Sequence, residues 1–345
     1  VPIIDIKQII TNFCYSISIS LLPWVAMGNL LITGGAGFIG SRLATIAANE
    51  GWNVIVLDIL STGLEATAKS LESKGIEVNI GDIRDRSLVA NLVGKSDSVV
   101  HLAAQVSVPI SVENPAETME INVNGTQNVI DSCLAHGVRR LVVASSAAVY
   151  GEAENLPLKE EAAGHLLSPY AESKWANEQQ IIEARSNGLQ ASCLRFFNVY
   201  GAGQRPDGAY AAVIPKFADM MAQGIRPQIN GDGQQTRDFV HVDDVCRAIM
   251  TLIEGDWKGE SHHVYNVATE TKISLLDLVS VINKSLANKV TQYSNLEPLF
   301  GTERPGDIRH SMACIGRIKE ILNWRPTIDF QDGIDELVIE RLALL

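Results

Sequence analysis

The sequence lacks the cysteine patterns that mark several classes of protein. It contains only five cysteines in 345 residues, Cys14, Cys133, Cys193, Cys246 and Cys314, and no two of them form a C-x-x-C pair. Scattered cysteines are typical of free thiols in a reducing compartment, which excludes a disulfide scaffold and argues against a cysteine metal site. We therefore expect a cytoplasmic protein without a metal centre.

Positive charge and long apolar runs are also scarce. Lys and Arg number 28 against 40 Asp and Glu, and no basic stripe appears, so a nucleic acid partner is not expected. The apolar stretch within residues 1–26 is broken by charged residues, serines and Pro23, so it is too short to span a bilayer and does not resemble a signal peptide. We expect no membrane partner, and for residues 1–26 we favour an upstream extension of the reading frame over an interfacial anchor.

Short apolar runs alternate with helical stretches from Met27 to Asn198. Runs of four or five apolar residues between helices predict an α/β fold with a doubly wound parallel, Rossmann-type sheet. The predicted strands are Asn29–Thr33, Asn53–Leu57, Glu77–Ile80, Ser98–Leu102, Arg140–Ala144 and Gln190–Phe196, and two of the long helices are Glu117–His136 and Tyr170–Asn187.

The composition changes after Asn198, where loops rich in Gly, Pro, Asp and Gln separate short helices and strands. This change predicts a smaller α/β lobe at the C-terminus. We assign residues 1–26 to the extension, 27–197 to the sheet domain, with elements of 233–270 contributing, and 198–345 mainly to the second lobe. No repeat or flexible linker separates the two parts, so we expect them to fold as one interlocked unit.

Three glycines, Gly34, Gly37 and Gly40, lie between the first strand and the following helix. Glycines at this spacing allow a tight turn, close approach of the backbone to a pyrophosphate, and close packing of the helix on the strand. Asp58 ends the second strand 18 residues after Gly40. A carboxylate there accepts hydrogen bonds from an adenosine ribose and repels a 2′-phosphate, so the pattern predicts NAD rather than NADP.

Two further polar residues follow the same edge of the sheet. Asp82, after the third strand, suits the amino group of an adenine. Asn122, in the stretch INVNGT, is either a cofactor contact or a polar residue inside a helix.

The stretch SPYAESK places Tyr170 four residues before Lys174, which on a helix puts both side chains on one face. Free tyrosine has a pKa of about 10, and a neighbouring ammonium together with a nicotinamide cation favours the phenolate. Tyr170 would then accept the proton of an alcohol. The fifth strand ends in Ser145 and Ser146, where a hydroxyl can share the hydrogen bond of the reacting alcohol. The order Ser, Tyr, Lys behind a glycine-rich turn predicts hydride chemistry.

These motifs together resemble the NAD-dependent epimerase/dehydratase family of extended short-chain dehydrogenases/reductases, in particular the UDP-glucose and UDP-N-acetylglucosamine 4-epimerases. The resemblance runs from about Gly28 to Leu322 through TGGAGFIGS, GDIRD, HLAAQ, INVNGT, SSAAVYG, SPYAESK, LRFFNVYG, GDGQQTRDFVHVDD and RPGDIRHS. One departure is Ile59, where many members carry Asn after the acidic residue.

The resemblance implies a role for each matching position. The implied catalytic residues are Ser146, Tyr170 and Lys174, and Tyr150 is implied to be structural. The implied NAD contacts are Gly34, Gly37, Phe38, Ile39, Gly40, Asp58, Thr62, Gly63, Asp82, Ile83, Leu102, Ala103, Ala104, Gln105, Asn122, Tyr170, Lys174 and Val199. The implied UDP-sugar contacts are Ser145, Ser146, Asn198, Ala212, Val213, Gln228, Asn230, Arg237, Arg304, Asp307 and Ser311, with the two arginines clamping the diphosphate.

The resemblance also narrows the reaction. The 4,6-dehydratases carry Asp-Glu, and the uronate decarboxylases a glutamate, where this chain has Ala147-Ala148. We therefore expect reversible C4 epimerisation of a UDP-hexose through a 4-keto sugar. Ser311 stands where a bulky tyrosine closes the sugar pocket of epimerases for simple hexoses, so we expect N-acetylated sugars to be accepted as well.

Several alternatives stay open at this point. The chain can act on UDP-glucuronate, or as another NAD-dependent nucleotide-sugar oxidoreductase, or as a non-catalytic dinucleotide sensor. The intact set of Ser146, Tyr170 and Lys174 argues against the last of these. The resemblance further implies a homodimer, formed through Glu117–His136 and Tyr170–Asn187.

Overall fold

The computed structural model describes residues 27–152, 155–207, 212–257, 262–303 and 308–345. Its strands are β1 Asn29–Thr33, β2 Asn53–Asp58, β3 Glu77–Ile80, β4 Ser98–His101, β5 Arg140–Ser146, β6 Gln190–Phe196, β7 Asn198–Tyr200, β8 Gln228–Asn230, β9 Thr236–Arg237, β10 Phe239–His241, β11 Val264–Val267, β12 Ile273–Ser274 and β13 Leu299–Gly301. Its α-helices are α2 Phe38–Asn49, α3 Glu65–Ser73, α4 Arg86–Val93, α5 Val108–Glu113, α6 Pro115–Met119, α7 Gly125–His136, α8 Pro169–Ser186, α9 Val213–Ala222, α10 Val242–Glu254, α11 Leu275–Ala287, α12 Gly316–Leu322 and α13 Phe330–Ala343. Three other turns of helix are η1 Glu120–Asn124, η2 Ala147–Tyr150 and η3 Glu160–Ala162.

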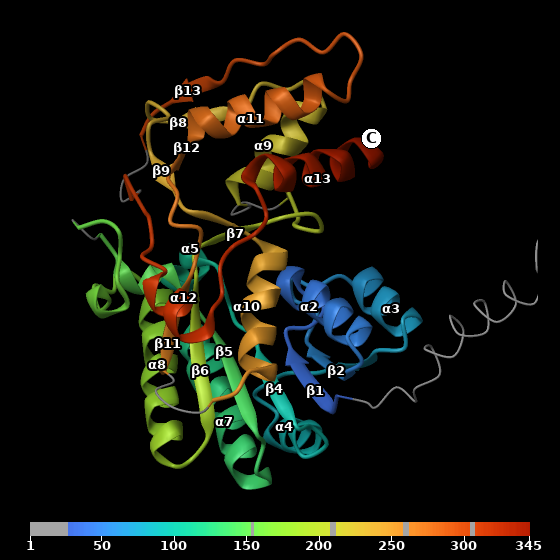
Figure 1. The fold of residues 1–345 in the computed structure, drawn as a ribbon, viewed down its shortest axis with the longest axis vertical. Helices are drawn as coiled ribbons and strands as arrows, with labels where there is room; N and C mark the ends of the chain where they lie inside the picture. Colours follow the sequence, from blue (N-terminus) through green and yellow to red (C-terminus); the bar gives the residue numbers. More distant parts are fainter. Residues whose placement is uncertain (1–26, 153–154, 208–211, 258–261, 304–307) are drawn as a thin grey trace, which may run out of the picture.

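Seven parallel strands form the central sheet in the order β11-β6-β5-β4-β1-β2-β3. This confirms the prediction of a Rossmann-type α/β fold. The strand order reverses between β1 and β4, and ligands of such folds bind beyond the carboxyl ends of the strands at this switch point. The seventh strand, β11, comes from the C-terminal half of the chain and pairs with β6 at the edge of the sheet (Figure 1).

Both faces of the sheet are covered by helices because the strands are apolar on both sides. Leu30 and Ile32 of β1 pack in the core with α2 and α10, whereas Leu31 packs in the core with α4, α7 and α8. This alternation follows from the two-residue period of a strand. Burial on both faces fixes the register of the sheet, and with it the positions of the residues that follow each strand.

The predicted long helix Glu117–His136 is in fact divided into three parts. It consists of α6, the single π-turn η1 and α7. A π-turn inside a helix changes the direction of the side chains that follow it and is frequent at functional sites. The other predicted elements agree with the structure to within two residues at each end.

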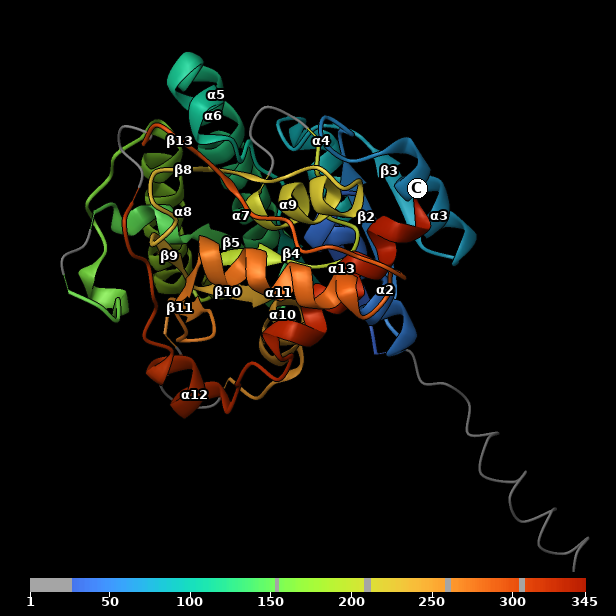
Figure 2. The same ribbon diagram turned by 90° about the horizontal axis from the view of Figure 1, so that it is seen from above.

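The second lobe has a core of its own above the sheet, as Figures 1 and 2 show. Helices α9, α11 and α13 pack together there on Tyr200, Ile229 and Phe239. Among the described residues, three two-stranded sheets, β10-β7, β12-β9 and β13-β8, accompany the large sheet. No helix among the described residues is long and apolar enough to cross a membrane.

Candidate active site

A cavity of about 1110 Å³ lies along the carboxyl edge of the large sheet and extends to the second lobe. Most of the predicted site residues line it. These are Gly34, Gly37, Phe38, Ile39, Gly40, Asp58, Thr62, Asp82, Ile83, Leu102, Ala103, Ala104, Gln105, Ser145, Ser146, Tyr170, Lys174, Asn198, Val199, Arg237 and Ser311. Gly63, Asn122, Ala212, Val213, Gln228 and Asn230 are not part of its lining, and Arg304 and Asp307 lie outside the described residues.

The turn between β1 and α2 leaves no room for a side chain at Gly34 or at Gly40. Gly34 has φ +70°, and a Cβ placed on it would lie 2.7 Å from the backbone nitrogen of Ala103. A Cβ on Gly40 would overlap the carbonyl oxygen of Gly34. No side chain caps the N-terminus of α2 at Gly37. The first amides of this helix therefore face the cavity with the positive end of the helix dipole, which is the arrangement that binds a pyrophosphate.

Asp58 is held at the end of β2 by two backbone amides. Its Oδ2 accepts a hydrogen bond from Ala36 N at 2.9 Å, and its Oδ1 accepts one from Leu60 N at 2.8 Å. The second bond forms because Leu60 has φ +58°, which bends the chain back toward the carboxylate. Each oxygen keeps a lone pair for a ribose hydroxyl. Ile59, the departure from the family pattern, is half exposed and also lines the cavity.

Asp82 is already paired within its own loop. Arg84 donates to its Oδ2 from Nε at 2.9 Å and from Nη2 at 2.5 Å. The hydrogen bond from the Arg84 guanidinium is the main cause that lowers the pKa of Asp82. The carboxylate therefore stays ionised and can still accept a hydrogen bond from an adenine amino group, which remains a prediction.

Asn122 has a structural place in the π-turn η1. Its Oδ1 accepts from Gln105 N at 2.7 Å, and its Nδ2 donates to Gln105 O at 2.9 Å and to Ser173 Oγ at 2.9 Å. Asn122 is buried, and these three bonds use both N–H donors and one of the two lone pairs of its amide. Asn122 was interpreted either as a cofactor contact or as a polar residue inside a helix, and the second interpretation fits these bonds. Asn122 holds Gln105 in the cavity wall.

Ser146, Tyr170 and Lys174 meet at the carboxyl end of β5. Helix α8 begins at Pro169, with Ser168 as its N-cap, so the Tyr170 backbone lies in the first turn and donates to Ser111 Oγ at 3.1 Å. The Ser146 hydroxyl hydrogen-bonds the Tyr170 side chain. One turn later, Lys174 Nζ donates to the carbonyl oxygen of Ala144 at 2.9 Å. All three residues border the same cavity.

The protein by itself does not lower the pKa of Tyr170. Burial raises this pKa, and the hydrogen bond with Ser146 opposes the increase only in part. Burial lowers the pKa of Lys174 to about 8. Lys174 alone therefore does not produce the lowered pKa expected for Tyr170, because the ammonium contacts a backbone carbonyl and its own charge is poorly solvated.

Ser145 borders the cavity, but its hydroxyl points into the protein, and its role in sugar binding stays a prediction. Successive residues of a strand point to opposite faces, and the Ser145 hydroxyl donates to buried Glu178 Oε1 at 2.5 Å. Tyr150 is almost fully buried, and its hydroxyl donates to Asn266 Oδ1 at 2.6 Å. Both side chains are thus used inside the protein, as was expected only for Tyr150.

The second lobe contributes Asn198, Arg237 and Ser311 to the cavity wall. Asn198 Nδ2 donates to Asp238 O at 3.0 Å, and the backbone N–H of Ser311 donates to Thr236 O at 3.1 Å. These bonds join the loop around residue 311 and β9 to the end of the large sheet. Gln228 and Asn230 lie on β8, and Ala212 and Val213 lie at the start of α9, beyond the lining of this cavity.

Several residues of the wall were not predicted from the sequence. They include Arg84, Phe196, Phe197, Gly203, Gln204, Arg205, Ile308 and His310. The Gly- and Pro-rich loop that contains Arg205 was recognised as a loop but was given no role. The position of this loop directly after β7, at the carboxyl edge of the fold, could have indicated a role in the site, because functional residues are often carried by such loops.

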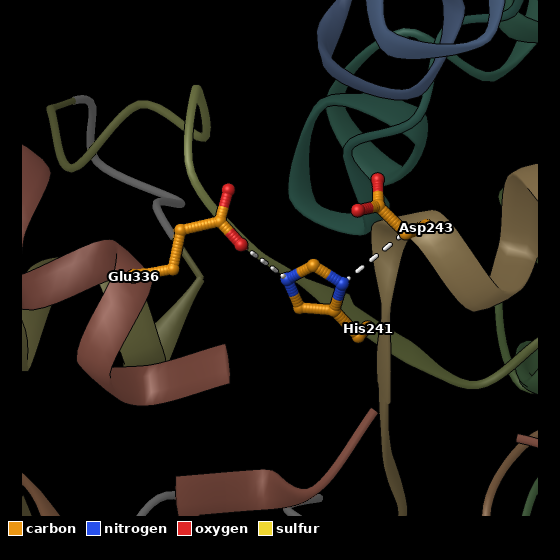
Figure 3. A group of neighbouring side chains, drawn as sticks. All are labelled: His241, Asp243 and Glu336. Atoms are coloured by element: carbon orange, nitrogen blue, oxygen red, sulfur yellow. Dashed lines mark hydrogen bonds and ion pairs between the residues drawn. The ribbon is translucent and has the colours of Figure 1, made fainter. Parts of the chain in front are cut away.

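A second polar cluster lies where the two lobes meet, and Figure 3 shows its members His241, Asp243 and Glu336. Arg42 donates to both oxygens of Asp243, at 2.5 and 2.7 Å, and therefore already balances this carboxylate. His241 Nδ1 accepts from Asp243 N at 3.3 Å, so a neutral ring carries its proton on Nε2, toward Glu336 at 3.5 Å. A protonated Nε2 is not a metal ligand, and we interpret the cluster as a contact between lobes.

Comparison with known proteins agrees with this geometry. Residues 30–268 match the model of the NAD dependent epimerase/dehydratase family. The UDP-glucose 4-epimerase of Mycolicibacterium smegmatis is 35% identical over 312 residues, which cover 89% of this chain and 96% of that protein. The UDP-N-acetylglucosamine 4-epimerase of Methanobrevibacter ruminantium, solved with UDP-N-acetylmuramic acid, superposes with a TM-score of 0.85 at 32% identity, covering 93% of this chain and all of the other.

A third match concerns the cofactor. The Thermus thermophilus UDP-glucose 4-epimerase, solved with NAD, superposes with a TM-score of 0.80 at 32% identity and covers 92% of this chain and all of the other. The family description confirms the prediction of NAD as cofactor, and the glycine turn and Asp58 fit that group. This chain is an enzyme, and it belongs to the NAD-dependent epimerase/dehydratase family.

Proposed function

We propose that this enzyme epimerises a UDP-hexose at C4 with NAD as a cofactor that is regenerated in each cycle. The observation that carries the proposal is one cavity that contains the glycine turn, Asp58 and the set of Ser146, Tyr170 and Lys174, and that continues to Arg237 and Ser311. Its similarity to UDP-sugar 4-epimerases over about nine-tenths of the chain supports the same reaction.

The chain supplies both a cradle for the cofactor and the groups that move the proton. Gly34 and Gly40 leave the space that the pyrophosphate needs, and Asp58 accepts from the adenosine ribose. When bound, NAD takes up and returns the hydride, and in its oxidised form it adds a positive charge to the cavity. Tyr170 accepts the proton of the sugar hydroxyl and later returns it, and the Ser146 hydroxyl hydrogen-bonds the same oxygen.

Lys174 favours the ionised form of Tyr170 by its positive charge, and burial makes that charge effective over a short distance. The resulting 4-keto sugar must turn within the cavity before the hydride returns to its other face. Arg237 provides a cation for the diphosphate, so the nucleotide stays anchored while the sugar turns. Arg304 and Asp307 are proposed to complete this anchor.

The family also contains dehydratases, which need an acid and a base to remove water. Ala147 and Ala148 line the cavity directly after Ser146, and neither provides a carboxylate there. This observation favours epimerisation. We further propose that N-acetylated sugars are accepted, because Ser311 is small and borders the cavity. The homodimer and the cytoplasmic location stay predictions.

The test is to incubate the purified protein separately with UDP-glucose, UDP-N-acetylglucosamine and UDP-glucuronate, and to resolve the C4 epimers of each. Conversion of a UDP-hexose without added NAD, by protein whose absorbance shows retained cofactor, supports the proposal. Conversion that needs continuous addition of NAD or NADH would instead indicate an oxidoreductase. No turnover of any sugar by NAD-loaded protein would contradict the proposed function.

A further inference from the structure

An ion pair is fully buried beside the catalytic groups. Arg195 of β6 donates to Glu178 of α8 from Nε at 2.8 Å and from Nη2 at 2.7 Å, and the side chains are 2% and 0% exposed. Removing two charges from water is costly, and the mutual attraction of such a pair rarely does more than balance that cost. A buried pair is therefore weak evidence for stability, which raises the question of what else this one does.

The pair contacts the strand end that carries Ser146. Glu178 Oε1 accepts a hydrogen bond from Ser145 Oγ at 2.5 Å, and Ser145 is the residue directly before Ser146 on β5. Glu178 also follows Lys174 by four residues on α8, so the two side chains share one face of the helix, one turn apart. The Glu178 carboxylate thus lies next to β5, which carries Ser146, and on the same face of α8 as Lys174.

Arg195 is fixed just as firmly on its other side. Its Nη1 donates to Tyr150 Oη at 2.8 Å and to Glu160 O at 2.7 Å, and its guanidinium lies 4.9 Å from the centre of the Tyr150 ring. Tyr150 in turn donates to Asn266 of β11 at 2.6 Å. The arginine therefore uses four of its five N–H donors on partners from three elements, and these bonds hold it in place.

We propose that the Glu178–Arg195 pair is a positioning unit for the reaction. It holds Ser145, and through Ser145 the backbone of Ser146, and it places a negative charge next to the Lys174 ammonium. Neither side chain lines the cavity. Arg195 holds the Glu178 carboxylate in place by two hydrogen bonds, and Glu178 acts on the two catalytic residues. This role rests on the proposed epimerase function.

Within the described part of the chain, four groups face Lys174, and Glu178 is the one among them that carries a charge near pH 7. They are the Ala144 carbonyl on β5, the Cys193 thiol on β6, His101 on β4 and Glu178 itself. Burial raises the pKa of Cys193 well above its usual range and lowers that of His101 to about 3, so both are neutral near pH 7. Glu178 is then the charged group that favours the Lys174 ammonium against the effect of burial.

The experiment compares the parent with Glu178→Gln, which keeps the size of the side chain and removes its charge. With the ammonium of Lys174 less favoured and Arg195 left uncompensated, the alkaline limb of the kcat profile should move to lower pH. We expect kcat at neutral pH to fall between about tenfold and a hundredfold. KM and the amount of NAD retained should stay close to the parent, because Glu178 does not line the cavity.

The matched control is Asp244→Asn, which alters another fully buried carboxylate paired with an arginine, away from the cavity wall. It should lower the melting temperature without moving the pH profile. An E178Q protein that is folded, active and unchanged in both kcat and pH profile would overturn the proposal. If the parent itself fails to epimerise, the proposed function has failed instead.

A second variant covers the case in which E178Q does not fold. Replacing both members, E178M with R195M, removes two buried charges together and leaves neither uncompensated, which proteins commonly tolerate. If the double variant folds with the parent's kcat, the pair is only structural and the proposal is wrong. A folded double variant that keeps NAD but loses kcat to a similar degree supports the positioning role.

Discussion

The carboxylate of Asp58 accepts a hydrogen bond from Ala36 N at 2.9 Å, and this bond joins the end of β2 to the glycine turn. The same carboxylate is therefore both a ligand for the ribose and a support for the turn that binds the pyrophosphate. A change at this position alters cofactor choice cleanly only if the bond to Ala36 survives.

Asp58→Asn meets this condition, because its amide oxygen still accepts from Ala36 N, while the negative charge and the bond from Leu60 N are lost. Without the charge the repulsion of a 2′-phosphate disappears, so the preference for NAD over NADP should fall by about tenfold or more. Binding of both dinucleotides to the stripped protein measures this ratio. A parent that already binds NADP better than NAD would contradict the role of Asp58.

Tyr170→Phe removes the phenol that is proposed to move the proton. Turnover should fall by about a thousandfold, the usual scale for a positioned acid–base group, while the retained NAD stays nearly unchanged. Tyr265→Phe is the matched control, because Tyr265 is buried, bonds His262 N at 2.9 Å and does not line the cavity. Turnover of Y170F within tenfold of the parent would exclude Tyr170 as the base.

The second and third glycines of the turn, Gly37 and Gly40, offer a graded test of packing. A Cβ on Gly40 would overlap Gly34 O, whereas a Cβ on Gly37 would lie 3.2 Å from the same atom and needs only a small shift. Gly40→Ala should therefore lower the melting temperature and the NAD content far more than Gly37→Ala. Overpacking of this kind costs about 1–3 kcal/mol or more. Equal effects of the two changes would show that the backbone does not pack more tightly around Gly40 than around Gly37.

His101 predicts how stability depends on pH. It is buried between Thr33 Oγ1 and Thr126 Oγ1, at 2.7 and 2.8 Å, and burial lowers its pKa from 6.5 to about 3. Between these two values the unfolded chain binds a proton that the folded chain does not, so stability is lost as the pH falls below 6.5. Down to pH 5 this amounts to about 2 kcal/mol. His101→Asn should show a smaller loss over this range in chemical unfolding; an equal loss would remove His101 as its source.

The sequence was sufficient for the parts of the site that local patterns encode. The turn at Gly34–Gly40, Asp58 at a strand end, and Tyr170 and Lys174 one helical turn apart all follow from spacing, and the structure brings them into one cavity. Ser145 also borders the cavity, but the inward direction of its hydroxyl could have been predicted from the strand alone. The two-residue period of a strand already requires that Ser145 and Ser146 point to opposite faces.

Other features depend on contacts between distant parts of the chain. Asn122 makes two hydrogen bonds to Gln105 because the π-turn η1 redirects its side chain. No residue pattern in the sequence indicated that turn. The partnership of Glu178 with Arg195 joins a helix to a strand that lies 17 residues further on, so it appears only when the sheet is assembled. Charged residues in an apolar setting are the signal that could have pointed to such a pair.

Ser311 gives the last prediction, which concerns the size of the sugar. Ser311 borders the cavity on the second lobe, and its backbone is fixed by the bond to Thr236 O. In Ser311→Tyr the new ring must therefore occupy cavity space rather than move the chain. Overpacking of this kind costs about 1–3 kcal/mol, or roughly 5- to 150-fold in kcat/KM, against the larger substrate.

UDP-N-acetylglucosamine should suffer that loss, whereas UDP-glucose, with a hydroxyl where the acetamido group would lie, should be turned over as before or faster. Assays of both sugars on the parent and on S311Y, together with Ser311→Ala as a control that adds no bulk, measure the effect. S311A should keep the parent's ratio of the two activities, because it changes the side chain without filling the cavity. Equal losses on both sugars in S311Y would mean that the ring blocks the whole cavity and that discrimination at C2 resides in another residue of the second lobe.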